Sequence, residues 1–270
     1  MKKLTEIQKA LKTYGKYTAV FRGGDAENNY KVLETLALEG PINAWECAKK
    51  ILTSYSTKDS LIPIEPKYQD VQSFRSTVNR RFDDLMKQQY VRVVRTDERG
   101  NIRIDVVGLT EKGRFLIRLA SSKVKENFDR MLQVYQEDSE DAMFWRLFAK
   151  HRPPLRVMDL FCRFDQSFLD SGEVNLDEVD PKRIYSLAYR NLLLKLYETF
   201  KDVVKGVSKV PSSFKDLSKS DSTFFWEMFS DPEFKSFIAE GVDQAGQDLG
   251  EISSGLKQFG RWIRTRTESS

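Results

Sequence analysis

Residues 71–85 combine an apolar stripe with a row of polar and basic side chains. The apolar residues recur at steps of three and four, which predicts a helix of about 70–89; they are Val71, Phe74, Val78, Phe82 and Leu85. The side chains expected on the opposite, outward face are Gln72, Arg75, Ser76, Asn79, Arg80 and Asp83. Arginine and asparagine match the edges of guanine and adenine in a DNA major groove, and serine suits phosphate. The pattern therefore indicates contact with a nucleic acid, with an ordinary solvated helix face as the alternative.

Residues 90–109 alternate between apolar and polar residues on both sides of a turn at Gly100, which predicts a β-hairpin. The hairpin carries four arginines, at Arg92, Arg95, Arg99 and Arg103. Arg99 lies near the expected tip, where it could reach a minor groove or a phosphate backbone. Over residues 71–103 eight lysines and arginines stand against four acidic residues. Binding through such residues should weaken strongly as salt rises.

The elements that would position these side chains can be expected from caps and periodicity. A helix over about 26–39 should end at Gly40 and Pro41. Asn43, with Glu46 three residues later, predicts the start of a short helix of 44–52. Residues 53–69 contain two prolines and indicate a loop, with room for one short strand at 61–64. Thr110 should cap a single helix that continues to about 136.

The order helix, helix, long helix, hairpin, helix over about residues 26–120 resembles the winged helix-turn-helix domain of bacterial and archaeal transcription regulators. The resemblance rests on STVNRRFDDLMKQQYVRVV (76–94), which looks like the recognition helix running into the first wing strand, and on GLTEKGRFLI (108–117). Two features depart from the family pattern. The connection before the long helix has about 17 residues where the family uses three or four, and Gln89 stands where many members have glycine.

The resemblance implies binding of double-stranded DNA by a transcription regulator acting as a homodimer on two half-sites. The implied DNA-binding residues are Gln72, Arg75, Ser76, Asn79, Arg80, Arg95, Arg99 and Arg103. A winged-helix domain can instead be a protein–protein assembly module, as in a subunit of a larger chromosome-organising complex. This second interpretation stays open at the level of the sequence. In either case we expect a cytoplasmic, nucleoid-associated protein.

Charge divides the chain into two parts. Residues 1–125 contain 24 basic and 15 acidic side chains, whereas residues 126–270 contain 20 basic and 25 acidic ones. We therefore expect the first part to meet a polyanion and the acidic part to contact a protein partner or a second copy of the chain. The expected organisation is a helical extension at 1–25 containing an amphipathic helix (3–17), a winged-helix domain at 26–120 and an all-helical domain at 121–270. The predicted fold class is mainly α with a small β-hairpin wing.

The acidic part is expected to contain helices only, near 140–150, 155–169, 181–205, 222–230 and 233–266. The last of these has apolar residues at heptad spacing from Ile238 to Ile263, flanked by glycines. This seam fits self-association, closure of its own domain, or a helix on a membrane surface. The acidic stretch 165–180 is interpreted as a solvated connection, because it lacks the glycine that a calcium-binding loop of the EF-hand type needs.

Several classes of chemistry are disfavoured. His151 is the only histidine, so histidine-based catalytic sets and multi-histidine metal sites have little to build on. No phosphate-binding glycine motif occurs, and Cys47 and Cys162 are expected as buried thiols. No apolar run is long enough to span a membrane, and the start lacks the apolar core of a secretory signal. We therefore expect no enzyme, no cofactor, no metal and no membrane partner.

Overall fold

The computed structural model describes residues 4–56, 65–135, 150–151, 155–171, 174–184, 187–188, 227 and 231–232. The chain divides into two compact units. The first contains Met1–Tyr135 and Val174–Lys182, and the second contains Gln136–Glu173 and Arg183–Ser270. The described residues are mainly helical with one small antiparallel sheet, which confirms the coarse prediction of fold class. No helix among them is both long and apolar enough to cross a lipid bilayer.

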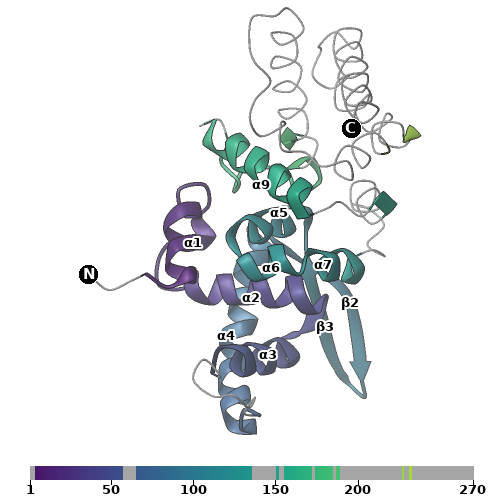
Figure 1. Cartoon of the computed structure of the whole chain (residues 1–270). Helices are drawn as coiled ribbons and strands as arrows, with labels where there is room; N and C mark the ends of the chain where they lie inside the picture. Colours follow the sequence, from purple (N-terminus) through teal and green to yellow (C-terminus); the bar gives the residue numbers. More distant parts are fainter. Residues whose placement is uncertain are drawn as a thin grey trace, which may run out of the picture. The chain divides into compact units, whose positions relative to one another are not determined.

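The first unit places its helices around the central α2 (Figure 1). Its elements, in chain order, are α1 (Glu6–Tyr14), the 3-10 turn η1 (Ala19–Phe21), α2 (Ala26–Glu39), β1 (Ile42–Asn43), α3 (Ala44–Ser56), α4 (Tyr68–Lys87), β2 (Val91–Arg99), β3 (Ile102–Leu109), α5 (Glu111–Ala120), α6 (Ser122–Glu126) and α7 (Phe128–Val134). The core of α2 is apolar and almost fully buried, at Val32, Leu33, Leu36 and Ala37. Burial of each of the larger side chains stabilises the fold by about 1.5–3 kcal/mol, and this burial holds the surrounding helices on α2.

The predicted helix ends are confirmed where a cap residue marks them. Gly40 ends α2 with a left-handed φ of 81°, and the Asn43 side chain accepts a hydrogen bond from the Glu46 amide at 3.0 Å. The Thr110 hydroxyl accepts one from the Gly113 amide at 3.2 Å, which starts α5. Where the sequence shows no cap, the observed helix ends differ from the expected ones. Helix α3 continues to Ser56 instead of ending at residue 52, and α4 begins at Tyr68 instead of at about residue 70.

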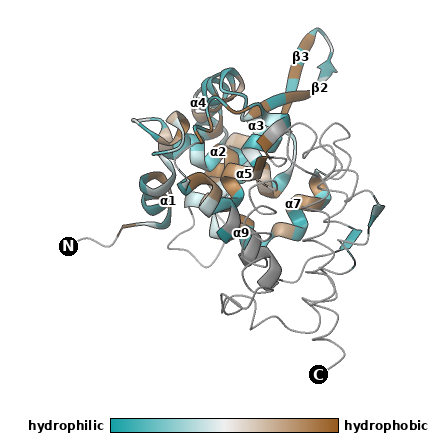
Figure 2. Ribbon diagram, turned by 90° about the horizontal axis from the view of Figure 1, so that it is seen from above, coloured by the Kyte–Doolittle hydropathy of each residue, from teal (hydrophilic) through white to brown (hydrophobic). Residues whose placement is uncertain are grey.

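The sheet has the order β1–β3–β2, and both pairings are antiparallel. Strand β1 was not expected, because two residues are too few to show a period in the sequence; it pairs Ile42 with Val107. The register of β2 against β3 shifts between Val93 and Arg95, which marks a bulge at Val94. Beyond this point the hairpin projects away from the helices of the first unit (Figure 2).

The junction between α4 and β2 is tightly fixed. Gln89 has φ of 62°, a left-handed conformation that turns the chain out of the helix. The Tyr90 amide then donates to the Leu85 carbonyl at 2.9 Å, and the Tyr90 carbonyl accepts from the Thr110 amide at 3.1 Å. A Cβ on Gly113 would lie 2.1 Å from the same Tyr90 carbonyl oxygen, so only glycine fits beside this turn.

The prediction of one helix from 111 to 136 is wrong. The segment forms three helices, separated at Ser121 and Asn127. Ser121 leaves the helix with extended backbone angles, accepts a hydrogen bond from the Val124 amide at 3.2 Å, and donates its hydroxyl to the buried Glu34 at 2.7 Å. The hydroxyls of Tyr30 and Tyr55 donate to the same carboxylate. A buried carboxylate must be satisfied by donors, so this network outweighs the local helical period.

Residues 121–135 lie in the first compact unit, together with the expected helical extension at 4–25 and the segment 26–120. The Tyr135 hydroxyl, after α7, donates to the Leu36 carbonyl of α2 and accepts from the Leu109 amide of β3, both at 3.0 Å. One side chain thus joins α7 to both a core helix and the sheet.

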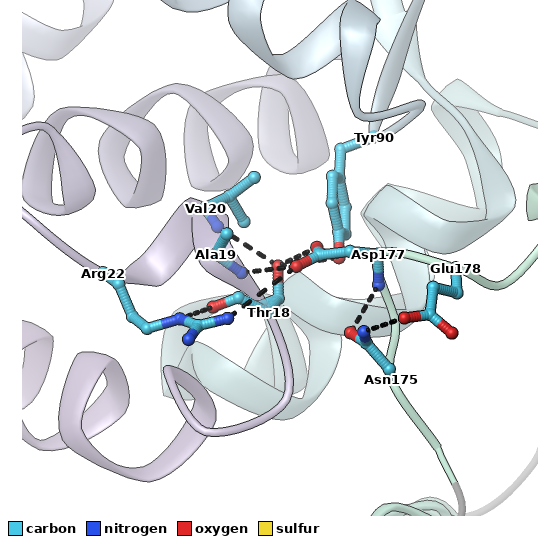
Figure 3. Close-up of polar contacts among 8 residues, drawn as sticks. All are labelled: Thr18, Ala19, Val20, Arg22, Tyr90, Asn175, Asp177 and Glu178. Carbon is cyan, nitrogen blue, oxygen red and sulfur yellow. Dashed lines mark hydrogen bonds and ion pairs between the residues drawn. The ribbon is translucent and has the colours of Figure 1, made fainter.

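The segment 174–182 also returns to the first unit, and Asp177 holds it there (Figure 3). The Asp177 carboxylate accepts from the Thr18 hydroxyl and the Ala19 amide, both at 2.7 Å, and from the Tyr90 hydroxyl at 3.0 Å. The Leu176 amide donates to the carbonyl of Tyr17, which precedes η1, at 3.0 Å. The interpretation of 165–180 as a solvated connection is therefore wrong: its first residues belong to α9 (Leu155–Asp170), and Asp177 is an anchor.

The described part of the second unit agrees with the expected helix at 155–169, since α9 ends one residue later. The helix expected from 181 begins with a 3-10 turn, η2 (Pro181–Arg183), which crosses the boundary between the units. The buried Asp231 accepts from Lys150 at 2.6 Å and lies 2.9 Å from the His151 ring nitrogen. The predicted strand at 61–64, the heptad seam, and most of the helices near 140–150, 181–205, 222–230 and 233–266 lie outside the described residues.

Candidate nucleic-acid interface

Helix α4 presents its polar row to solvent. Its inward residues Val71, Val78, Phe82 and Leu85 are buried and Phe74 is half-buried, so the predicted apolar stripe is the packed face. Gln72, Arg75, Ser76, Asn79 and Arg80 are all exposed. Since α3 and α2 pack against the apolar side, the helix cannot turn without losing that burial.

An open groove of about 650 Å³ separates the exposed face of α4 from the hairpin. Gln72, Arg75 and Asn79 line it from α4, and Arg99 and Arg103 line it from the strands. Side chains that are up to 31 residues apart in the sequence therefore face one space. Ser76, Arg80 and Arg95 are exposed but do not line the groove; the Ser76 hydroxyl donates to the carbonyl of Ser73 at 2.8 Å.

The lining of the groove is balanced in charge. Three arginines, Arg75, Arg99 and Arg103, face three acidic residues, Glu46, Asp83 and Asp105. Asp105 also accepts a hydrogen bond from the Thr96 hydroxyl at 2.8 Å. An anion inside the groove would therefore meet both signs of charge.

The arginines of the interface differ in their ion pairs. Arg95 lies 3.1 Å from Asp97, and Arg103 lies 3.8 Å from Glu98, both within the hairpin. By contrast, Arg75, Arg80 and Arg99 form no ion pair with any residue that the structure describes. These three are the side chains best placed to bind an outside phosphate.

Two aromatic residues that sequence reasoning did not select lie at the groove. The rings of Trp45, at the start of α3, and Tyr68, the first residue of α4, have centroids 5.0 Å apart with planes tilted by 45°. Tyr68 is 70% exposed. The sequence contains a signal for them, because both aromatic residues stand at the start of a helix and outside its apolar stripe, where a core residue is not expected. Tyr68 was missed since the helix was expected to begin two residues later.

The start of α4 is tied to α3 by an ion pair. The Lys49 ammonium lies 2.7 Å from the Glu65 carboxylate, three residues before α4. This hydrogen bond and charge lower the pKa of Glu65 and raise the pKa of Lys49. Both groups are solvent-exposed, so the pair helps to orient the entry into α4 more than it stabilises the fold.

Comparison of the chain with protein-family models, with curated proteins and with solved structures finds no match. The residues of the groove must therefore indicate its use by themselves. They offer an exposed helix face with amide and guanidinium groups, a projecting hairpin with a free arginine, and an aromatic pair. Such a set can hydrogen-bond to base edges and attract phosphates.

Proposed function

We propose that the first unit is a winged helix-turn-helix domain that binds double-stranded DNA, with α4 as the recognition helix and the β2–β3 hairpin as the wing. The order of α2, α3, α4, the hairpin and α5 follows the order on which the resemblance in the sequence rests. We further propose that the protein is a transcription regulator that works in the cytoplasm on the nucleoid.

One observation carries the proposal: five of the eight selected residues line one open groove, and the other three are exposed to solvent. An α-helix fits the major groove of B-DNA, where Arg75 could pair with guanine and Asn79 or Gln72 with adenine. Arg80 and Arg99 would contact phosphates or a minor groove at the two sides of that helix.

The dimer remains part of the proposal. A homodimer would present two recognition helices to half-sites about 34–36 Å apart, one turn of DNA. The heptad seam on which this expectation rests, from residue 238 to 263, is outside the described residues. The mass of the full chain in solution, measured alone and with DNA, tests it directly.

The DNA-binding proposal is tested by electrophoretic retardation with a double variant, Arg75→Ala with Arg80→Ala. Both side chains are exposed, so the variant should melt like the original protein and lose DNA retardation at moderate salt. A matched control, Lys9→Ala with Lys12→Ala, removes the same charge from the exposed face of α1. Equal binding by the original protein and the Arg75/Arg80 variant would remove α4 from the interface.

A protein-assembly role is the alternative, and one observation favours it. The hairpin exposes Ile102 at 65% and Val93 at 41%, apolar groups that phosphate contacts do not need. A stoichiometric protein partner retained at low and high salt, together with no affinity for duplex DNA, would support this role against the first.

A further inference from the structure

We propose that the groove between α4 and the hairpin holds an unpaired nucleobase, so that the protein prefers DNA with an unpaired stretch over fully paired duplex. This inference rests on the proposed function and names the form of DNA that the same surface selects. It draws on three features of the groove: its charge balance, its aromatic end and its amide groups.

The charge balance disfavours a phosphate inside the groove. Arg75, Arg99 and Arg103 are opposed by Glu46, Asp83 and Asp105 on the same lining. A phosphate in this space would gain from the arginines and lose to the carboxylates at close range. A nucleobase is neutral and carries both hydrogen-bond donors and acceptors at its edge, so both signs of charge can serve it. A phosphate of the same strand, outside the groove, could meet the exposed Arg80.

The aromatic end supplies a surface on which a base can stack. Tyr68 lines the groove, and 70% of its surface is exposed. Trp45 supports it at 5.0 Å between ring centroids, so the exposed ring is held in place by a second aromatic residue. A large exposed ring is costly to hydrate, and stacking of a base would cover it.

The amides of Gln72 and Asn79 line the same groove from α4. They lie one and three turns into the helix that begins at Tyr68, on its exposed side. A side-chain amide offers a donor pair and an acceptor, which is the combination that recognises the edge of a base. The floor contains Phe82 and Val107, so the inner end of the space is apolar. A volume of about 650 Å³ is ample for one nucleoside.

Paired DNA can offer its base edges to these amides, but it cannot stack a base on Tyr68. In a duplex both faces of each base are covered by its stacked neighbours, and only the base edges are open to a protein. Stacking on Tyr68 therefore adds affinity only where a base has already left the stack, or is single-stranded from the start. The preference for an unpaired stretch follows from which surfaces of the base are available.

The test compares three DNA probes of one sequence: a duplex, the same duplex with a short internal mismatch bubble, and the single strand. Binding of the full chain is measured by fluorescence anisotropy at low and moderate salt. We expect tighter binding of the bubble than of the duplex. Tyr68→Ala should weaken bubble and single-strand binding about 5- to 150-fold, the range found for loss of one base–aromatic stack, and leave duplex binding nearly unchanged. Tyr68→Phe keeps the ring and should bind all three probes like the original protein.

The outcomes separate this inference from the proposed function. Equal binding of bubble and duplex, or an equal effect of Tyr68→Ala on all three probes, overturns the unpaired-base inference and leaves duplex binding intact. Failure to bind any probe at low salt overturns the proposed function, and the inference with it. Arg80→Ala serves as the reference for a phosphate contact, because it should weaken all probes together. Tyr68 is exposed, so unchanged thermal unfolding of its variants shows that the fold is kept.

Discussion

At the scale of single residues, neighbouring arginines of α4 have opposite roles. Arg81 is buried, and its guanidinium lies 2.9 Å from Asp25 and 2.8 Å from Asp84. Arg80 is exposed and forms no ion pair with a described residue. The two residues are of the same type, but Arg81 lies next to the apolar stripe and therefore points inward. Arg81 thus stabilises the fold, and Arg80 is available to a ligand.

Alanine substitution of each arginine should separate these roles. Arg81→Ala removes two ion pairs from a site shielded on the arginine side, and should lower the free energy of unfolding by about 1–3 kcal/mol. Arg80→Ala should change it by less than about 0.5 kcal/mol, as at an ordinary surface position. Urea denaturation followed by circular dichroism measures both. Equal destabilisation by the two variants would contradict the assignment.

Burial changes the acid–base behaviour of Cys47. The side chain is fully buried on α3 and forms no disulfide. Burial raises the pKa of its thiol well above the ordinary value, because the thiolate would lose its hydration. A sulfur this shielded is a poor nucleophile and a poor sensor of oxidants.

The shifted pKa of Cys47 predicts a loss of stability at alkaline pH. Above about pH 8.5 the thiol of the unfolded chain ionises while the folded thiol keeps its proton. The unfolded state is thereby favoured, so this group lowers the free energy of unfolding by up to about 1.4 kcal/mol per pH unit. Cys47→Ala should show a flatter decline between about pH 8.5 and 10, where buried tyrosines do not yet ionise. Cys162→Ala, at a half-buried position, should keep the original decline. The measurement is urea denaturation at a series of pH values.

At the scale of elements, the sequence predicts what local signals determine. The bounds of α2, the caps at Asn43 and Thr110, and the apolar face of α4 follow from residues within one or two turns. Five of the selected site residues could be brought to one groove because the hairpin follows α4 directly. The exposure of the selected residues on α4 could be predicted because they lie opposite the apolar stripe of that helix.

Other features depend on contacts between distant residues, which no local pattern reveals. Strand β1 exists because Ile42 pairs with Val107, far along the chain. The breaks after α5 depend on Glu34, which binds Ser121 across 87 residues. Tyr68 also lines the groove, although the sequence did not select it; the residue lies at the start of α4, where its ring contacts Trp45. Tertiary contacts outweigh local propensity at these places.

The Asp177 anchor joins three elements and makes a prediction at this scale. Asp177→Ala removes the acceptor of the Thr18 hydroxyl and of the Ala19 amide and one of the two acceptors of the Tyr90 hydroxyl, and should cost about 1–3 kcal/mol of unfolding free energy. Tyr90→Phe removes one of these donors and should cost about 1 kcal/mol. Because they share a hydrogen bond, the double variant should cost less than the sum of the two.

Denaturation of the single and double variants measures this coupling. Glu178→Ala is the matched control: its carboxylate is exposed and, among the residues that the structure describes, binds only Asn175, three residues away, so little change is expected. Strictly additive effects of Asp177→Ala and Tyr90→Phe would show that the hydrogen bond between Tyr90 and Asp177, drawn in Figure 3, contributes no stability.

At the scale of the whole molecule, net charge is a poor guide to the interface. The chain carries only +4, because 20 basic and 25 acidic residues in 126–270 offset the basic excess of residues 1–125. Charges farther than about 10 Å from bound DNA are largely screened at 0.1 M salt. Affinity should therefore depend on the few arginines that touch phosphates, and not on the net charge of the chain.

This argument predicts the salt dependence of DNA binding by the full chain. Each phosphate contact contributes about −0.9 to the slope of log affinity against log salt. The proposed phosphate contacts of Arg80 and Arg99 should make the slope at least as steep as about −1.8. Replacing Arg80 and Arg99 by alanine should make it shallower by about 1.8, whereas replacing Lys9 and Lys12 removes the same charge and should leave it unchanged. Anisotropy titrations over a range of salt concentrations measure the slopes. If the lysine variant and the arginine variant gave the same slope, binding would depend on the net charge of the chain and not on these two arginines.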